Sequence, residues 1–405
     1  MKTLLKQIKT LATATYPETV EFRRHLHQYP ELSFHEKETS AFVAKQLNAW
    51  GIPHQQNVSG YGVVGLIEGR NAPAGCVGLR ADMDALPITE RSDKSYRSCN
   101  PGVMHACGHD AHTAILLSTA HILQQLRHEF EGTVKLIFQP AEEKLPGGAI
   151  GMINAGILQH PTVDAIVGLH VLPSMAAGSL GFRSGAFMAS SDEITICITG
   201  KGGHAAMPHL SNDTILAAGH VIVALQQLVS RMNSPLIPSV LSFGNITTEG
   251  AHNILPSEVV ISGTFRTFDE NWRLQAHEKI KNIAIHTAAA SGTTAEVTIG
   301  HGYPVVRNDN TLTRLAMDIS TEMIGKQNVQ EIEARMTAED FGWYGQHVPA
   351  CFFRLGTAGI APETASGLHS PTFDIDENSL LTGVTAMSSI AVHILNSINL
   401  GKNEG

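Results

Sequence analysis

Cysteine is scarce in this sequence. The chain of 405 residues has five cysteines, which are odd in number and widely spaced. A protein that depends on disulfides usually carries a denser, even-numbered set and resides in an oxidising compartment. We therefore expect free thiols and a cytoplasmic location. The cysteines are Cys76, Cys99, Cys107, Cys197 and Cys351.

Basic residues and long hydrophobic runs are also in short supply. The 28 Lys and Arg residues are outnumbered by 37 Asp and Glu residues, and the formal net charge is −9. A nucleic-acid-binding protein usually carries a basic patch, so this charge argues against such a partner. No run approaches the ~18 apolar residues of a membrane-spanning helix, and the first residues lack the apolar core of a signal peptide. We expect neither nucleic acid nor a membrane as a partner.

The composition is that of a folded protein with more than one core. Hydrophobic residues make up 43% of the sequence and charged residues 16%, which is ordinary for a globular chain. Its length exceeds what one hydrophobic core usually serves, so we expect two domains.

The charges of Arg23 and His27 fall near a predicted helix end, where they are expected to face solvent or a neighbouring loop.

Apolar strands alternate with helical segments along the first part of the chain. Several strands end in polar residues, which is typical of an open α/β sheet that binds its ligand at the carboxyl edge. Strands are predicted at 63–67, 76–84, 133–140 and 163–170, and helices at 18–50 (broken at Tyr29-Pro30), 110–128 and 148–156.

The pattern changes near residue 187. From there to residue 302 the order is β, α, β, β, α, β with half-exposed alternation, which suits an antiparallel sheet with helices on one face. We interpret 187–302 as an inserted domain, and 1–186 with 303–405 as the surrounding one. After the insertion, 312–324 and 380–397 are predicted helices and 349–356 a buried strand.

The segment 103–112 packs three His, one Cys and one Asp into ten residues. If the segment is extended, His105, Cys107 and His109 point to one side. A helix should follow, with Asp110 as its N-cap or first-turn acid. Thiolate and imidazole ligands together favour a transition metal. The alternative is a buried Cys among helix-capping histidines.

Further metal-binding candidates follow predicted strands. Glu142 and Glu143 come directly after one strand, where one carboxylate can bind a metal and the other can act as a general base; a solvated turn is the alternative. His170 ends another strand, although a lone His there is more often a core residue. His369 lies in a loop rich in Gly and Ser.

These candidates together exceed the four ligands of a tetrahedral zinc site. They suit a dinuclear site in which one group bridges two metals roughly 3.5–4 Å apart. Asp82 and Asp84 are expected to accept hydrogen bonds from the ligand histidines rather than to bind metal. The candidate ligands are Cys107, His109, Glu143, His170 and His369.

Eight motifs, spread over nearly the whole chain, resemble the M20 metallopeptidases. Within that family they are similar to the amidohydrolase branch of hippurate hydrolases, N-acyl-amino-acid amidohydrolases and plant auxin-conjugate hydrolases. The motifs are 79–88 (LRADMDALPI), 104–110 (MHACGHD), 139–143 (QPAEE), 168–170 (GLH), 200–206 (GKGGHAA), 251–256 (AHNILP), 263–266 (GTFR) and 368–371 (LHSP).

The resemblance implies a fold and an activity. The fold is an α/β catalytic domain that carries two divalent metals on a mixed, mostly parallel sheet flanked by helices. The inserted domain is an α+β, ferredoxin-like lid that often mediates dimerisation, so a homo-oligomer (a dimer, or a tetramer) is expected. The activity is hydrolysis of the amide bond of an N-acyl or N-aroyl amino acid. The metals are expected to be Zn, Mn, Co or Ni.

The resemblance also implies roles for single residues. Cys107 is similar to the bridging ligand, and Glu142 to the general base. His204 resembles a residue that reaches the scissile carbonyl, in some relatives from the partner subunit. Asn253 and Arg266 resemble groups that hold the substrate carboxylate. By the same resemblance, His109, Glu143, His170 and His369 are the other ligands, and Asp84 orients a ligand histidine.

Three other functions stay open at this point. A thiol hydrolase that uses Cys107 as nucleophile would survive a chelator and be inactivated by iodoacetamide. A peptidase on the same scaffold would prefer dipeptides over acyl amino acids. A non-catalytic metal-binding protein would hydrolyse neither, although Glu142 beside a full ligand set argues against it.

Overall fold

In the computed structural model, which describes residues 2–359 and 366–403, the chain forms two compact units. Unit 1 comprises Met1–Phe187, Arg307–Glu333 and Asp340–Gly405, and unit 2 comprises Met188–Val306 and Ala334–Glu339. Unit 2 begins one residue after the proposed start of the insertion and ends four residues after its proposed end. No sequence pattern indicates that the short segment after residue 333 returns to unit 2.

An eight-stranded mixed sheet forms the centre of unit 1, with the order β1-β2-β4-β3-β5-β16-β6-β15. The central strands β4, β3, β5 and β16 are parallel to one another, whereas the pairs β1/β2, β2/β4 and β16/β6 are antiparallel. The strands are β1 (His54–Val58), β2 (Gly62–Glu68), β3 (Cys76–Asp82), β4 (Thr133–Gln139), β5 (Ala165–Ala176), β6 (Leu180–Phe182), β15 (Val329–Glu331) and β16 (Ala350–Ala358).

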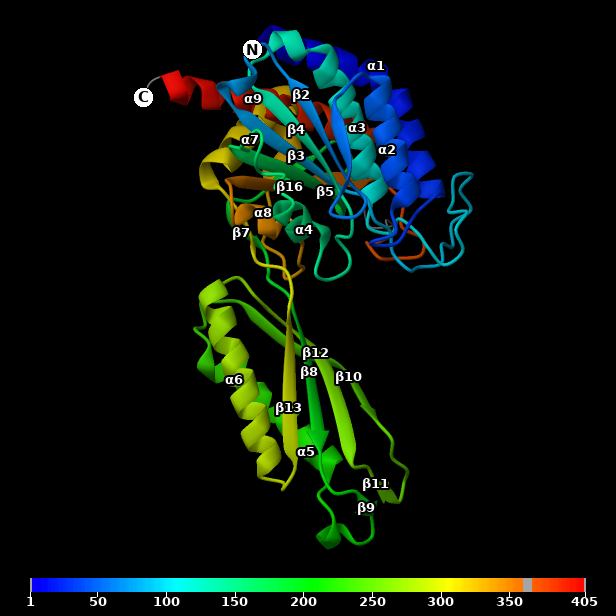
Figure 1. The fold of residues 1–405 in the computed structure, drawn as a ribbon, viewed down its shortest axis with the longest axis vertical. Helices are drawn as coiled ribbons and strands as arrows, with labels where there is room; N and C mark the ends of the chain where they lie inside the picture. The colour runs from blue at the N-terminus through cyan, green and yellow to red at the C-terminus, as the bar shows by residue number, and fades with distance from the viewer. Residues whose placement is uncertain (1, 360–365, 404–405) are drawn as a thin grey trace. The chain divides into compact units, whose positions relative to one another are not determined.

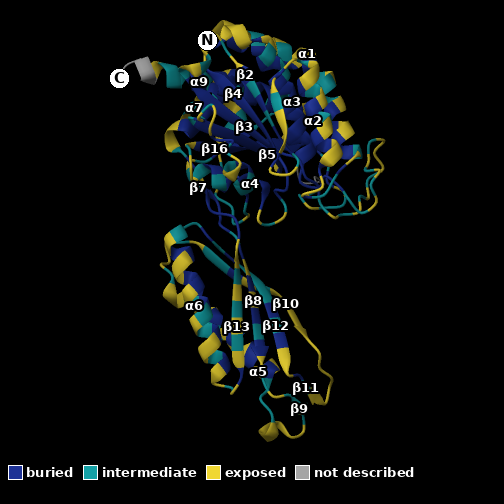
Figure 2. Ribbon diagram, in the orientation of Figure 1, coloured by how far each residue is buried: buried dark blue, intermediate teal, exposed yellow. Residues whose placement is uncertain are grey.

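Helices enclose this sheet. Every residue of β3 and β4 is buried, as expected for parallel strands covered on both faces, and Figure 2 shows the central strands in the colour of buried residues. The helices α1, α3 and α9 pack on one another. The helices are α1 (Lys2–Gln28), α2 (Lys37–Ala49), α3 (His109–Gln125), α4 (Gly148–Asn154), α7 (Asn310–Ile324), α8 (Gly342–Gly345) and α9 (Asn378–Asn403).

Unit 2 is an antiparallel four-stranded sheet with the order β10-β12-β8-β13. Its two helices pack on each other and on the sheet (Figure 1). The order of elements and of strands is that of a ferredoxin-like fold, as predicted. The elements are β8 (Asp192–Thr199), β9 (Gly203–His204), α5 (Thr214–Leu225), β10 (Ser239–Thr248), β11 (Ile254–Leu255), β12 (Glu258–Thr267), α6 (Glu270–Ala289) and β13 (Thr294–His301). The short strands β7 (Gly185–Met188) and β14 (Val306–Asn308) lie where the units meet in the sequence.

Among residues 2–359 and 366–403, two helical stretches are long and apolar enough to cross a membrane by length and composition alone. Asn378–Leu400 is mostly buried, so its apolar residues are accounted for by the core of unit 1. Thr214–Met232 belongs to unit 2 and exposes much of its apolar surface. All five cysteines are free, as the composition predicts.

Two local expectations are wrong, and a third is correct in part. His170 does not end a strand, because β5 continues to Ala176. The segment before α3 is not an extended strand; Met104 makes one isolated bridge to Leu86. Arg23 and His27 do lie near the end of α1; they are 0% and 1% exposed, so of the two expected surroundings they face neighbouring loops, at Asp374 and Glu90, and not solvent. Their charges are neutralised inside the protein by acidic partners.

Candidate active site

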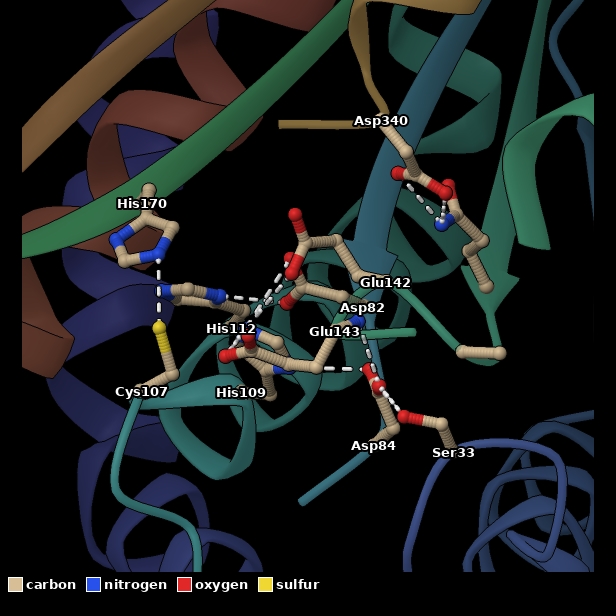
Figure 3. Close-up of polar contacts among 12 residues, drawn as sticks. Ser33, Asp82, Asp84, Cys107, His109, His112, Glu142, Glu143, His170 and Asp340 are labelled. Atoms are coloured by element: carbon tan, nitrogen blue, oxygen red, sulfur yellow. Dashed lines mark hydrogen bonds and ion pairs between the residues drawn. The ribbon is translucent and has the colours of Figure 1, made fainter. Parts of the chain in front are cut away.

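The candidate site lies beyond the carboxyl ends of β3 and β4, beside the middle of β5 (Figure 3). β3 stops at Asp82, so the longer β5 extends past it and presents His170 to the space there. α3 begins at the same place. A glycine precedes it because Gly108 has a φ of 85° and a Cβ there would lie 2.5 Å from Val171 of β5. Gly108 therefore lets the start of α3 approach β5 closely.

His109 projects from the first turn of α3 into this space. Its Nδ1 donates to Oδ1 of Asp84 at 3.2 Å, which fixes the ring. Its buried Nε2 has no hydrogen-bond partner among the described residues, and it lies 4.0 Å from Oε2 of Glu142 and 3.9 Å from Oε1 of Glu143. Burial alone lowers the pKa of His109, but Asp82 and Asp84 outweigh burial and raise it to about 10. A divalent cation would meet the same negative charge.

Cys107 and His170 face each other across the site. The Nδ1 of His170 donates to the Val171 carbonyl oxygen at 2.7 Å, so its Nε2 is left to face Sγ of Cys107 at 3.4 Å. Burial, with Glu143 and Glu142 adding to it, raises the pKa of the Cys107 thiol. An activated nucleophilic cysteine needs the opposite shift, so this environment disfavours a thiol hydrolase.

Glu143 and His369 complete the site from two loops. Nε2 of His369 lies 3.3 Å from Oε1 of Glu143. The backbone amide of Glu143 donates to Oδ2 of Asp84, so one carboxylate holds both Glu143 and His109 in place. The His369 side chain is 54% exposed, and its backbone amide donates to the Ala106 carbonyl oxygen at 2.8 Å. His369 is thus the most exposed of the candidate ligands.

The donor atoms form two sets of three that share Cys107. Within each set all donor atoms lie within 4.8 Å of one another. The first set is Cys107, His109 and His170, and the second set is Cys107, Glu143 and His369. One thiolate, three imidazoles and one carboxylate are ligands that Zn and related transition metals take. The residues therefore fit two cations that share one sulfur ligand.

Asp82 makes different contacts from those expected. The Asp82 carboxylate accepts hydrogen bonds from Nδ1 of His112 at 2.6 Å and from Arg80 at 2.6 Å. The sequence predicted that it would accept one from a candidate ligand histidine. Nε2 of His112 in turn accepts from the Val171 amide at 2.9 Å. Asp82 thus positions β5 next to His170 through His112. Of the two aspartates, Asp84 hydrogen-bonds a candidate ligand histidine directly, whereas Oδ2 of Asp82 lies 3.7 Å from Nε2 of His109.

Comparisons with known proteins identify the family of this chain. The model of peptidase family M20/M25/M40 matches residues 78–393. The chain belongs to this family. The N-acyl-L-amino acid amidohydrolase of Geobacillus stearothermophilus is 42% identical over 305 residues, which cover 75% of this chain and 82% of that protein. The N-acetyl-L-cysteine deacetylase of Bacillus subtilis is 39% identical over 381 residues, which cover 94% of this chain and 89% of that protein.

A solved structure extends the similarity to the fold. The YxeP protein of Bacillus subtilis, a dinuclear metal-binding peptidase of family M20, superimposes with a TM-score of 0.80 at 34% identity. The similarity covers 95% of this chain and 99% of that one. This M20 chain is accordingly a metal-dependent hydrolase of amide bonds, built on the mixed α/β fold that the sequence predicts.

Unit 2 carries the other three predicted site residues of this M20 chain. His204 pairs with Ile254 between β9 and β11, and the Ala205 amide donates to the Asn253 carbonyl oxygen, so His204 and Asn253 are neighbours. Arg266 lies near the other end of β12, where it donates to the Met336 carbonyl oxygen at 3.1 Å. Figure 1 shows β9 and β11 at the end of the sheet where β12 begins. The structure therefore does not bring Arg266 to His204 and Asn253 within one copy of unit 2.

Sequence reasoning missed several buried groups that support the site. Ser33 donates to Oδ2 of Asp84 at 2.6 Å. Arg80 donates to Asp340 at 2.8 Å as well as to Asp82, and Gln139 donates to both oxygens of Asp340. One feature of the sequence could have indicated these groups. Arg80 is a charged residue inside an apolar strand, and such a residue needs a buried partner. Its partner lies 260 positions away in the chain.

Proposed function

We propose that the chain hydrolyses the amide bond of N-acyl or N-aroyl amino acids, such as hippurate or N-acetyl amino acids, to a carboxylic acid and a free amino acid. The relatives named above support this substrate class. The observation that carries the proposal is the position of Glu142, whose carboxylate lies beside the two ligand sets while its neighbour Glu143 belongs to one of them. That arrangement provides a base next to two Lewis acids.

We propose two divalent cations per chain, with Cys107 as the shared ligand. Zn suits a thiolate ligand, and the oxygen and nitrogen ligands also admit Mn, Co or Ni. When bound, the cations lower the pKa of a water molecule and polarise the amide carbonyl. His109 and Glu143 are held for this task by Asp84, and His170 by its bond to the Val171 carbonyl oxygen.

The side chains then carry the protons. Glu142 takes a proton from the attacking water and passes it to the amide nitrogen as the C–N bond breaks. Glu142 is 6% exposed, so a proton that its carboxylate has taken up is shielded from bulk solvent. His204 donates a hydrogen bond to the developing oxyanion. Asn253 and Arg266 bind the substrate carboxylate, for which the guanidinium offers a bidentate donor pair.

The geometry of unit 2 favours a site shared between two chains. The stretch of β12 from Glu258 to Arg266 spans about 26 Å at ~3.3 Å per residue, which is longer than an acyl amino acid. His204 and Asn253 lie beyond one end of this stretch and Arg266 near the other. We therefore assign His204 and Asn253 to the site of a partner chain, with Arg266 supplied by a different lid.

Unit 2 also has a suitable surface for a second copy. α5 exposes Ile215, Leu216 and Val223, at 49%, 54% and 72%. β10 is at the edge of the sheet, and no other described strand pairs with its outer edge. Apolar helix faces and open strand edges are what protein interfaces cover. We therefore propose a dimer through unit 2.

The free cysteines support a cytoplasmic location.

Metal analysis and hydrolysis assays on one sample test this function. Protein purified without chelator should contain about two metals per chain, and it should hydrolyse hippurate or N-acetyl amino acids before EDTA and after divalent ions are restored, but not between. A dipeptide panel run in parallel separates the second candidate, a peptidase, which the naming of YxeP as a peptidase supports. Metal-free protein with chelator-resistant activity would overturn the proposal.

A further inference from the structure

A buried arginine of α1 connects two segments that carry candidate metal ligands. Arg23 is 0% exposed, and its Nε donates to Oδ2 of Asp110 at 2.9 Å. Its Nη2 donates to Oδ1 of Asp374 at 2.7 Å. Asp110 directly follows His109 in the first turn of α3, and Asp374 lies five residues after His369. One guanidinium therefore ties the start of α3 to the loop that carries His369.

The two acids have further partners, and these fix the same loops. Nδ1 of His27 is bonded to Oδ2 of Asp110 at 2.8 Å. Oδ2 of Asp374 accepts from Tyr96 at 3.0 Å and lies 3.0 Å from the Lys94 ammonium. These contacts converge on Arg23, whose guanidinium carbon also lies 4.9 Å from the centre of the Tyr96 ring. The arrangement is a buried network, unlike an exposed ion pair.

The second set needs this support more than the first. Cys107, His109 and His170 come from the buried start of α3 and from β5, where the surrounding core holds them. The second set adds His369, which is half exposed and has a positive φ of 62° in its loop. Without Arg23, the carboxylates of Asp110 and Asp374 would lose the one cation that both of them bond, although His27 and Lys94 would still contact one acid each. The loop that carries His369 is held to the segment before α3 by the bond of the His369 amide to the Ala106 carbonyl oxygen, and Arg23 adds a second tie through Asp374.

We propose that Arg23 is a positioning residue for the dinuclear site, which holds His369 against the start of α3 and thereby sets the affinity for the cation of the second set. This inference rests on the two-metal site proposed above. Arg23 itself touches neither substrate nor metal. Groups that orient metal ligands from behind typically account for a factor of about 10–100 in metal affinity.

Cobalt titration of the chelator-stripped full-length chain tests the proposal. The probe is Co²⁺, followed by its total binding and by the charge-transfer absorbance that the Cys107 thiolate gives with cobalt. Wild type should bind two Co²⁺ ions. Arg23→Met should bind the first ion with unchanged affinity and the second about tenfold more weakly or worse, so that its absorbance saturates near one equivalent.

Two further variants separate positioning from folding. Asp374→Asn keeps the buried Arg23–Asp110 pair and should also weaken the second ion, even if Arg23→Met does not fold. Arg24→Met is the matched control. Arg24 is 47% exposed, bonds Glu377 and lies over the Tyr96 ring, but among the described residues no hydrogen bond or ion pair joins it to Asp110 or Asp374; both ions should bind as in wild type. Folded Arg23→Met or Asp374→Asn protein with two wild-type dissociation constants overturns the role of Arg23. A wild type that binds fewer than two ions overturns the two-metal site itself.

Discussion

Asp84 holds His109 by a hydrogen bond of 3.2 Å between its Oδ1 and the Nδ1 of the ring. The contact settles which nitrogen of the ring faces the candidate metal site, because a proton on Nδ1 leaves Nε2 as the lone-pair donor. The other oxygen of Asp84 accepts from Ser33 and from the Glu143 amide. One buried carboxylate therefore aligns ligands of both sets.

Replacement of Asp84 should weaken metal binding without touching a ligand. Asp84→Asn retains the shape of the side chain but removes the negative charge of the carboxylate, which accepts hydrogen bonds from the His109 ring and the Glu143 amide. We expect metal affinity to fall by roughly 10–100-fold, measured by competition with a chelator of known affinity. Ser33→Ala, which removes one neutral donor to the same carboxylate, should have a smaller effect. Unchanged affinity in Asp84→Asn would show that His109 is aligned by other means.

The adjacent glutamates should separate into two roles. Glu142→Gln should lower kcat by roughly 10²–10⁴-fold because the general base is gone, while metal content stays at the wild-type level. Glu143→Gln should lose metal together with activity, since its carboxylate belongs to the second set. Elemental analysis and steady-state assays on both variants give the comparison. Full activity in Glu142→Gln would end the assignment of this residue as base.

Metal removal should destabilise the fold as well as abolish activity. The site gathers Glu142, Glu143 and Asp82 around His109, and these charges lose their counter-ion when the metals leave. A ligand at 100 times its dissociation constant stabilises the folded state by about 2.7 kcal/mol. We expect EDTA to lower the melting temperature and divalent ion to restore it. Identical melting curves with and without EDTA, in protein shown to lose its metal, would contradict this.

Much of the site can be predicted from sequence because its ligands lie in short local patterns. Cys107 and His109 share one motif, and Glu143 follows a strand whose apolar run is easy to recognise. Because carboxyl ends of neighbouring parallel strands meet at one edge, segments far apart in sequence can be placed together. The structure places His170 beside this edge, although its strand continues beyond it.

The supporting residues could not be predicted in the same way. Arg23 resembles a surface charge near a helix end until its partners, 87 and 351 positions away, are known. His112 lies one turn beyond His109 in α3, and this spacing alone does not distinguish a ligand from a residue that bonds Asp82 and the Val171 amide. Such long-range pairings depend on the packing of whole elements, which local periodicity does not encode.

Unit 2 should lose stability in acid through Asp192. Burial alone raises the pKa of Asp192, but His277 and Arg273 outweigh burial and lower it from 3.8 to about 2. A carboxyl group whose pKa is lower in the folded than in the unfolded chain stabilises the fold at pH values above its unfolded pKa. This contribution, roughly 2 kcal/mol, disappears as pH falls from about 4 to about 2. Urea unfolding of Asp192→Asn and wild type should differ at neutral pH and converge in acid. A difference that is independent of pH would contradict the linkage.

The division of the proposed site residues of unit 2 between the two ends of β12 predicts complementation between inactive chains. Glu142→Ala and His204→Ala should each be inactive as homodimers. If His204 acts on the partner's site, a mixed dimer has one site with both residues intact, so random mixing should restore about a quarter of wild-type activity in a symmetric dimer. The assay requires exchange of subunits, verified by size and by a tag on one variant. A mixed dimer without activity would show that His204 and Glu142 of the same chain work together.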